Sequence, residues 1–182
     1  YSDLIYTETG WSNVTGPEIG NDVVMAFGLK TSSITCNNLY VAAGTGLVIA
    51  VEGTLLAQGD VVNEGTIEIN SGGSFVNDNY SGDGNFTYHR NTTYDIGEWR
   101  YSFIGSPVSN HDLSATTGSF KFTYDEATDT YLDASGISSM TNGVGYTIAN
   151  NDVIAFTGTP NSGNIFVGVT NNGNGFNLIA NP

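Results

Sequence analysis

The chain has 182 residues, of which 39% are hydrophobic and 12% aromatic, so it can bury a core and is not disordered throughout. Its 18 acidic side chains against four basic ones give a net charge of −14, which repels phosphate backbones and anionic lipid surfaces. These figures exclude nucleic acid as an expected partner. No apolar run reaches the length of a membrane span, so we expect no membrane insertion. Cys36 is the only cysteine, so no intrachain disulfide forms, and its alternating neighbours predict a buried strand position.

The first region of the chain consists of short alternating segments separated by Gly and Asn. Residues 46–57 and 65–76 form a near-repeat, in which one glycine opens an alternating strand and a second glycine turns the chain. A unit this small cannot bury its own apolar face, so it must stack on copies of itself. We therefore predict a short, β-helix-like β-solenoid over residues 1–90. The expected inward positions are Leu39, Leu47, Leu55, Ile67 and Phe75.

The second region, residues 91–182, is richer in aromatic side chains and has longer, irregular strand patterns, for example at 120–124 and 164–169. Residues 101–107 and 176–182 share one pattern of alternating aromatic, polar and apolar residues that ends in proline. Because proline cannot donate to a ladder, each copy is expected to end a strand at a sheet edge. Helix signals are nearly absent, so the predicted fold is all-β, with a β-sandwich-like second half.

Catalytic patterns are weak. The two histidines, His89 and His111, lie outside any nucleophile elbow, and we interpret both as surface residues. The basic residues that a polysaccharide lyase would use against developing negative charge are scattered along the chain. They are Lys30, Arg90, Arg100 and Lys121. We therefore predict that the chain is not an enzyme and keep a solenoid lyase or hydrolase as the second alternative.

Two acidic turns, at residues 77–83 and 125–130, offer oxygen ligands that suit Ca²⁺ rather than zinc. Neither has the spacing of an EF-hand loop, so plain turns are the preferred interpretation. The second lies between Tyr124 and Tyr131 and predicts a hairpin loop whose acidic residues face water. No cofactor is expected to be required, and calcium at these turns is the alternative.

Exposed aromatic side chains are the remaining candidates for binding, because a flat ring offers an apolar face to a sugar. The alternative for Trp99 and Tyr101 is a role as core anchors, because both belong to or adjoin the repeated motif. The candidate ligand-binding residues are Trp11, Tyr94, Trp99 and Tyr131.

Several motifs follow one another in a specific order along nearly the whole chain. They lie at Trp11-Ser12-Asn13, 21–24, 36–41, 90–93, 99–108, 156–161 and 175–182. In this order they resemble a solenoid-plus-β-sandwich module of large secreted and cell-surface proteins of Bacteroidota, many of them cargo of the type IX secretion system. The resemblance implies a piece of a longer polypeptide, secreted or at the cell surface, with the type IX secretion machinery as its partner during export. It carries over no catalytic residues.

These observations together predict a non-enzymatic module of a large exported, adhesin-like protein that acts as a scaffold or contact surface. Its expected partners outside the cell are surface glycans or other surface proteins. The first alternative is a carbohydrate-binding module of a secreted polysaccharide-degrading enzyme, which would use the exposed aromatic residues.

Overall fold

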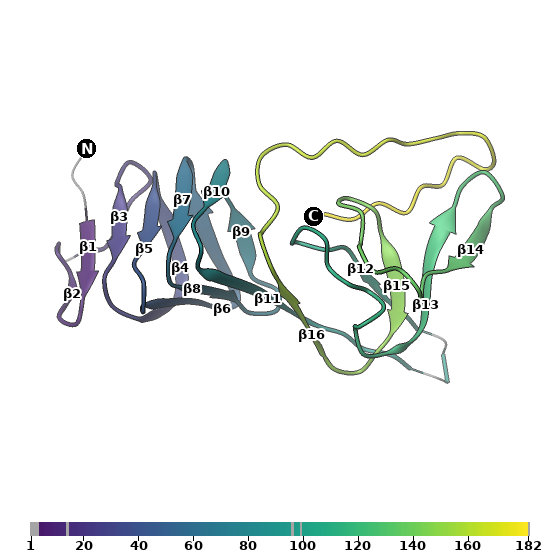
Figure 1. The fold of residues 1–182 in the computed structure, drawn as a ribbon, viewed down its shortest axis with the longest axis horizontal. Helices are drawn as coiled ribbons and strands as arrows, with labels where there is room; N and C mark the ends of the chain where they lie inside the picture. The colour runs from purple at the N-terminus through teal and green to yellow at the C-terminus, as the bar shows by residue number, and fades with distance from the viewer. Residues whose placement is uncertain (1–3, 14, 96, 99, 182) are drawn as a thin grey trace. The chain divides into compact units, whose positions relative to one another are not determined.

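The computed structural model describes residues 4–13, 15–95, 97–98 and 100–181, which form strands and no helix (Figure 1). The chain divides into two compact units, Tyr1–Arg90 and Asn91–Pro182. The strands that begin in the first unit are β1 (Leu4–Thr7), β2 (Gly10–Trp11), β3 (Val23–Met25), β4 (Leu29–Cys36), β5 (Leu39–Val41), β6 (Gly46–Ala57), β7 (Asp60–Asn63), β8 (Thr66–Ile69), β9 (Ser74–Val76), β10 (Asn79–Ser81) and β11 (Asn85–Asn91). Those of the second are β12 (Ser102–Ile104), β13 (Ser119–Asp125), β14 (Thr130–Asp133), β15 (Tyr146–Ala149) and β16 (Val153–Thr157).

The first unit is a β-solenoid of about four turns. One of its parallel sheets runs β10-β7-β5-β3-β1 and is extended by the two-residue antiparallel strand β2. The other runs β11-β8-β6-β4, and β9 also pairs with β6. Equivalent residues of successive turns stack in register. One stack is Val23, Leu39, Val61 and Tyr80, and another is Leu29, Leu47, Ile67 and Phe86. The predicted fold class is confirmed: the described residues are all-β, and a solenoid is followed by an additional antiparallel sheet.

The solenoid core consists of the side chains that the alternation assigned to the interior. Leu39, Leu47, Leu55 and Ile67 are buried as predicted, and Cys36 is buried beside them. Phe75 is only half-buried, because it lies on the last complete turn. Its ring packs against that of Phe86, with the centroids 5.1 Å apart. Burial raises the pKa of the Cys36 thiol to about 12.

The glycine in the middle of the repeat lets one long strand form two sides of a turn. Residues 46–49 of β6 pair with β8, and residues 54–56 pair with β9. Between them Glu52 has a left-handed φ of 60°, and a Cβ at Gly53 would lie 1.9 Å from the carbonyl oxygen of Ser32. Only glycine allows the neighbouring turn to approach this closely.

A column of polar side chains connects the turns at one corner of the solenoid. The Asp22 Oδ1 atom accepts hydrogen bonds from the amide groups of Asn37 and Asn38, each at 2.8 Å, and the bond from Asn37 is the main cause of the lowered pKa of Asp22. Asn38 Oδ1 in turn accepts from the backbone of Asp60 at 2.8 Å, and Asn79 Nδ2 donates to Asp60 Oδ1 at 2.9 Å. Each turn is therefore tied to the next by side chains as well as by the sheet ladder.

The second unit is built around a four-stranded antiparallel sheet in the order β12-β15-β13-β14 (Figure 1). Ile104, Tyr146 and Ile148 point to one face of this sheet and are buried. Segments outside the sheet contribute the remaining buried side chains of this unit, which include Val108, Leu113, Met140, Ile154 and Phe156. The result is a layered core in which only one layer is a regular sheet.

The C-terminal segment departs from the prediction. Residues 164–169 alternate like a strand, but residues 161–181, all described, form no strand. Val167 is half-buried and packs against Gly143. The alternating pattern therefore reflects the partial burial of one side of the segment and not its membership of a sheet. The first of the two motifs that end in proline, residues 101–107, contains β12, which is an edge strand as predicted. The second forms only a single bridge between Ile179 and Val144, since it has no strand beside it along its length.

Candidate functional site

One face of the sheet in the second unit carries aromatic side chains. Residues paired across antiparallel strands lie on the same face of a sheet. Phe103 and Phe122 therefore share a face, because both pair with Thr147 of the central strand β15. Tyr124 and Tyr131 pair with each other two residues further along and lie on the same face. This face is opposite to the one that forms the core.

The rings on this face contact one another in a continuous series. The ring centroids are 5.7 Å apart for Tyr94 and Tyr101, 6.4 Å for Tyr101 and Phe122, 6.5 Å for Phe122 and Tyr131, and 5.3 Å for Tyr131 and Tyr124. Together with Phe103, these residues are called the aromatic face below. Phe103 is 57% exposed and Tyr131 is 54% exposed. Neighbouring rings hold the others in tilted or edge-to-face contacts, so ligand binding orders few additional side chains.

The structure brings together two of the four residues predicted to bind a ligand. Tyr94 and Tyr131 belong to the aromatic face and are connected through Tyr101 and Phe122, as the contacts above show. Trp11 lies in the first unit, on β2, where its ring packs against Tyr6 with the centroids 4.9 Å apart. Trp99 lies outside the described residues.

Four members of the aromatic face are absent from the four candidate ligand-binding residues: Tyr101, Phe103, Phe122 and Tyr124. The signal that would have found them is period-two spacing, because Tyr101 and Phe103 alternate with polar or apolar neighbours and so do Phe122 and Tyr124. Alternate residues of a strand point to the same side. Which side faced solvent was decided only by the burial of the opposite face.

The hairpin end of the aromatic face carries hydroxyl and carboxylate groups. The Tyr124 hydroxyl donates to Asp129, and this hydrogen bond raises the pKa of Tyr124 to about 12. Asp133 continues the row of Phe122 and accepts a hydrogen bond from the backbone of Ser135 at 2.9 Å, and the hydrogen bonds from Ser135 lower its pKa. Apolar rings beside neutral hydroxyls and ionised carboxylates suit a neutral polar ligand and repel an anionic one.

Residues 178–180 of the C-terminal segment lie beside the aromatic face near the ends of β12 and β15. A Cβ at Gly105 would lie 2.3 Å from the Cβ atom of Ala180, and one at Gly145 would lie 2.7 Å from Leu178 Cγ. Gly105 follows Ile104, and Gly145 precedes Tyr146, so both positions adjoin the aromatic rows. The two glycines therefore leave the space in which residues 178–180 lie against the sheet.

A single carboxylate holds the C-terminal segment at the tip of the β13–β14 hairpin. Glu126 is 5% exposed, and its two oxygen atoms accept four hydrogen bonds. The donors are Thr170 Oγ1 at 2.8 Å and the backbone N–H groups of Asn172, Gly173 and Gly175 at 2.9, 2.6 and 2.9 Å. These donors, led by the Asn172 N–H, lower the pKa of Glu126 to about 2. The prediction that the acidic residues of this turn face water is therefore wrong for Glu126.

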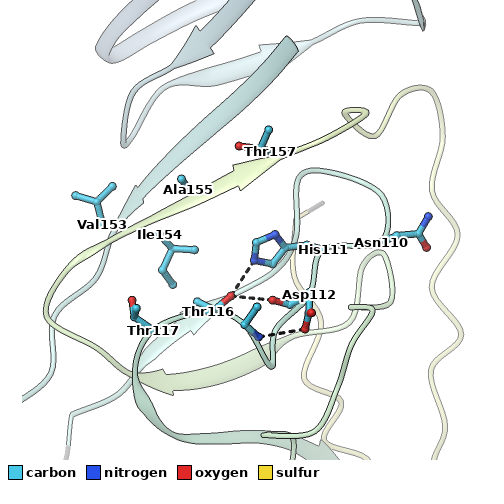
Figure 2. Close-up of a pocket in the computed structure, with 10 residues that line it drawn as sticks. Asn110, His111, Asp112, Thr116, Thr117, Val153, Ile154, Ala155 and Thr157 are labelled. Atoms are coloured by element: carbon cyan, nitrogen blue, oxygen red, sulfur yellow. Dashed lines mark hydrogen bonds between the residues drawn. The ribbon is translucent and has the colours of Figure 1, made fainter. Parts of the chain in front are cut away.

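The second unit also has an open hollow of about 520 Å³ beside His111 (Figure 2). It is lined by residues 110–112, 115–117, 153–155 and 157. His111 Nε2 lies 2.9 Å from Thr116 Oγ1, and the ring packs on Phe156 with the centroids 4.4 Å apart. His111 is thus partly enclosed rather than a surface residue as predicted, and this burial lowers its pKa.

The Thr116 hydroxyl lies within hydrogen-bond distance of two groups, His111 Nε2 at 2.9 Å and the carbonyl oxygen of Asp112 at 3.1 Å. The side chain of Asp112 is itself engaged, because it accepts from Ser114 Oγ at 2.6 Å.

Three of the remaining charged candidates, His89, Arg100 and Lys121, have structural partners. His89 Nε2 lies 3.2 Å from Glu68 Oε1, and Arg100 pairs with Glu98. Lys121 is 5% exposed and donates from Nζ to backbone carbonyl oxygens. Over the described ranges, no three His, Cys, Asp or Glu side chains converge in a geometry that could hold a metal ion. Over the same ranges, no helix is suited by length and hydropathy to span a membrane.

Comparison with known proteins identifies one family. Its model, described as Domain of unknown function (DUF8693), matches residues 5–182. No curated protein and no solved structure gives a match. The matched range includes the solenoid and the whole sheet of the second unit. The chain belongs to the family described as Domain of unknown function (DUF8693).

Proposed function

We propose that the chain is a non-enzymatic contact module of a large exported cell-surface protein, of the type IX secretion cargo type. In this proposal the solenoid is a stiff scaffold, and the aromatic face of the second unit is the surface that touches a partner outside the cell. The acidic composition fits the solubility of an exported protein, and a chain without disulfides fits a bacterial surface protein better than a small animal ectodomain. The stacked, apolar solenoid core supports the scaffold role.

The observation that carries the proposal is the exposure of the aromatic face. Burial of an aromatic side chain lowers the free energy, and a contiguous exposed apolar patch marks an interaction site more often than a single exposed residue does. Phe103 and Tyr131 are each more than half exposed, whereas Ile104, Tyr146 and Ile148 on the opposite face of the same sheet are buried.

Bead retention tests the contact role. Beads coated with the chain are passed over surfaces that carry neutral polysaccharide, acidic polysaccharide or protein, and retained beads are counted. We expect retention on at least one surface and its loss in the double variant Phe103→Ser, Tyr131→Ser. The matched control is Ile19→Ser, Val51→Ser, which removes two exposed apolar side chains from the first unit. Equal retention of both variants would show that the aromatic face is not the contact surface.

A carbohydrate-binding module is the second candidate, and the chemistry of the hairpin end of the aromatic face favours it. Rings that stack on the apolar face of a sugar lie there beside hydroxyls and carboxylates that can bond to sugar hydroxyls. The net charge of −14 restricts the ligand to neutral or cationic glycans.

A glycan array separates the two candidates. The carbohydrate role predicts binding to neutral glycans that is lost in Tyr131→Ala and Phe103→Ala and kept in Trp11→Ala, because Trp11 lies in the other unit. Bead retention on protein with no glycan binding would leave the contact role and remove the carbohydrate role. Thermal unfolding of each variant checks that the fold is intact.

A further inference from the structure

The outer strand of the sheet, β14 (Thr130–Asp133), is exposed along its whole length. It pairs only with β13 among the described strands (Figure 1). All four of its residues are exposed. The other edge strand, β12, differs because Ile104 is buried. An open edge strand offers unpaired peptide groups to any extended chain that lies beside it.

The register of the hairpin identifies the peptide groups that point outward. The Ala134 N–H donates to the Lys121 carbonyl oxygen, and hydrogen-bonded pairs alternate along an antiparallel ladder. The peptide groups of Leu132 and Thr130 therefore point toward β13. Those of Tyr131 and Asp133 point away from it, at the spacing of two ladder rungs. A further strand could bond to both residues.

Both faces of this edge present apolar side chains. Tyr131, 54% exposed, lies on the aromatic face, and Leu132, 47% exposed, lies on the opposite face. Alternate side chains of an added strand point to opposite faces of the sheet. Its odd-numbered side chains would therefore cover Tyr131, and its even-numbered side chains would cover Leu132.

The charge near this edge is negative. Asp129 and Asp133 are exposed within or beside the hairpin strands, and Asp125 is half-buried there. The one basic residue of these two strands, Lys121, points inward, with its ammonium group on the carbonyl oxygens of Leu113, Ser114 and Thr116. No positive charge of the hairpin therefore offsets the aspartates on the solvent side.

We propose that β14 is a docking edge that accepts an extended, basic segment of a partner protein as a fifth strand. The backbone of the segment bonds to the peptide groups of Tyr131 and Asp133, its apolar residues cover Tyr131 and Leu132, and its lysines or arginines face the hairpin aspartates. A second copy of this chain is disfavoured as the occupant, because each copy carries a net charge of −14. The proposal goes beyond the contact role of the aromatic rings, since it depends on backbone groups and on the other face of the strand.

Peptide binding tests the docking edge. The probe is a blocked eight-residue peptide in which lysine alternates with valine. Its controls are the same peptide with glutamate for lysine and a lysine peptide whose alternate backbone nitrogens are methylated. Affinity is measured by fluorescence anisotropy at several salt concentrations, and hydrogen exchange of the Tyr131 and Asp133 amides is measured with and without peptide. We expect salt-dependent binding of the lysine peptide that slows exchange at both amides and that neither control peptide reproduces.

Variants locate the site. The double variant Leu132→Lys, Asp133→Lys should weaken binding of the lysine peptide by at least about tenfold, because it places like charges against the ligand. The matched control Phe103→Ser alters the aromatic face at the opposite edge strand and should leave this binding unchanged. It therefore separates failure of the docking edge from failure of the proposed contact role.

Three results would overturn the inference. The first is equal binding of the glutamate or methylated peptide, and the second is binding without slower exchange at Tyr131 and Asp133. The third is a concentration-dependent dimer in sedimentation that protects the same two amides without peptide, which would make a second copy the occupant.

Discussion

The two units of this chain bury their side chains in different ways. In the solenoid, each turn repeats the contacts of the one before it, and the polar column of Asp22, Asn38, Asp60 and Asn79 repeats with the turns. In the second unit, a four-stranded sheet depends on irregular segments to complete its core, and Glu126 holds a long segment without strands. Stability is therefore distributed over equivalent contacts in the first unit and concentrated at single residues in the second.

This difference has consequences for mutation. A repeat unit is stabilised mainly by its nearest neighbours, so damage to one turn of a short solenoid weakens the adjoining turns as well. A segment held by one side chain opens locally when that side chain is changed. The following predictions test this contrast, from the largest expected effect to the smallest.

The largest effect is expected from Leu55→Ala in the solenoid core. Leu55 is fully buried on β6 between turns, so its truncation should lower the free energy of unfolding of the solenoid by about 2–5 kcal/mol. The measurement is urea unfolding followed by alkylation of Cys36, which is buried, has a pKa raised to about 12, and reacts only when the solenoid opens. Val51→Ala, at an exposed position of the same strand, is the control. Faster alkylation in the control than in Leu55→Ala would contradict the distributed core.

A smaller loss is expected from Asn38→Ala in the polar column. The change removes a donor to Asp22 and the acceptor for the Asp60 N–H, and we expect a cost of about 1–3 kcal/mol. The rate of Cys36 alkylation in urea measures this loss of stability, as it does for Leu55→Ala. Exposed Asn85 supplies the matched control, Asn85→Ala. A change of stability no larger than that of the control would show that the ladder alone sets the spacing of the turns.

The most local effect is expected at Glu126. Its pKa in the folded chain is about 2 against an ordinary value of 4.5, so the charged form stabilises the segment fully above pH 4.5. This stabilisation is lost as the pH falls toward 2. Hydrogen exchange at the Gly173 and Gly175 amides should become less protected over that range and in Glu126→Gln at neutral pH. Glu8→Gln, an exposed site in the other unit, is the control. Loss of Cys36 protection in Glu126→Gln would mean that the effect is global.

Much of the solenoid could be predicted from the sequence because its contacts are close in the chain. Gly53 and its counterpart Gly73 mark where the chain turns, and alternation places Leu47 and Ile67 inside. The same reasoning failed at residues 164–169, where the alternation of a half-buried segment resembled a strand. Whether such a segment joins a sheet depends on a partner distant in the sequence, and no local pattern specifies that partner.

The candidate site was predicted only in part for the same reason. Tyr94 and Tyr131 were selected as exposed aromatic residues, but their connection through Tyr101 and Phe122 depends on strands that pair across 20 or more residues. The proposed docking edge also depends on this order, because β14 is open only if β13 lies between it and β15.

The amino-acid sequence by itself determined that the chain is all-β, that its first half stacks as a solenoid, and that Cys36, Leu47 and Leu55 are inside. Glycine turns and period-two burial act over a few residues, so they can be read locally. Only the tertiary structure decided which face of the second sheet is exposed, that Glu126 is buried in a ring of backbone donors, and that His111 lines a hollow. Each of these outcomes depends on segments far apart in the chain that approach one another only in the folded state.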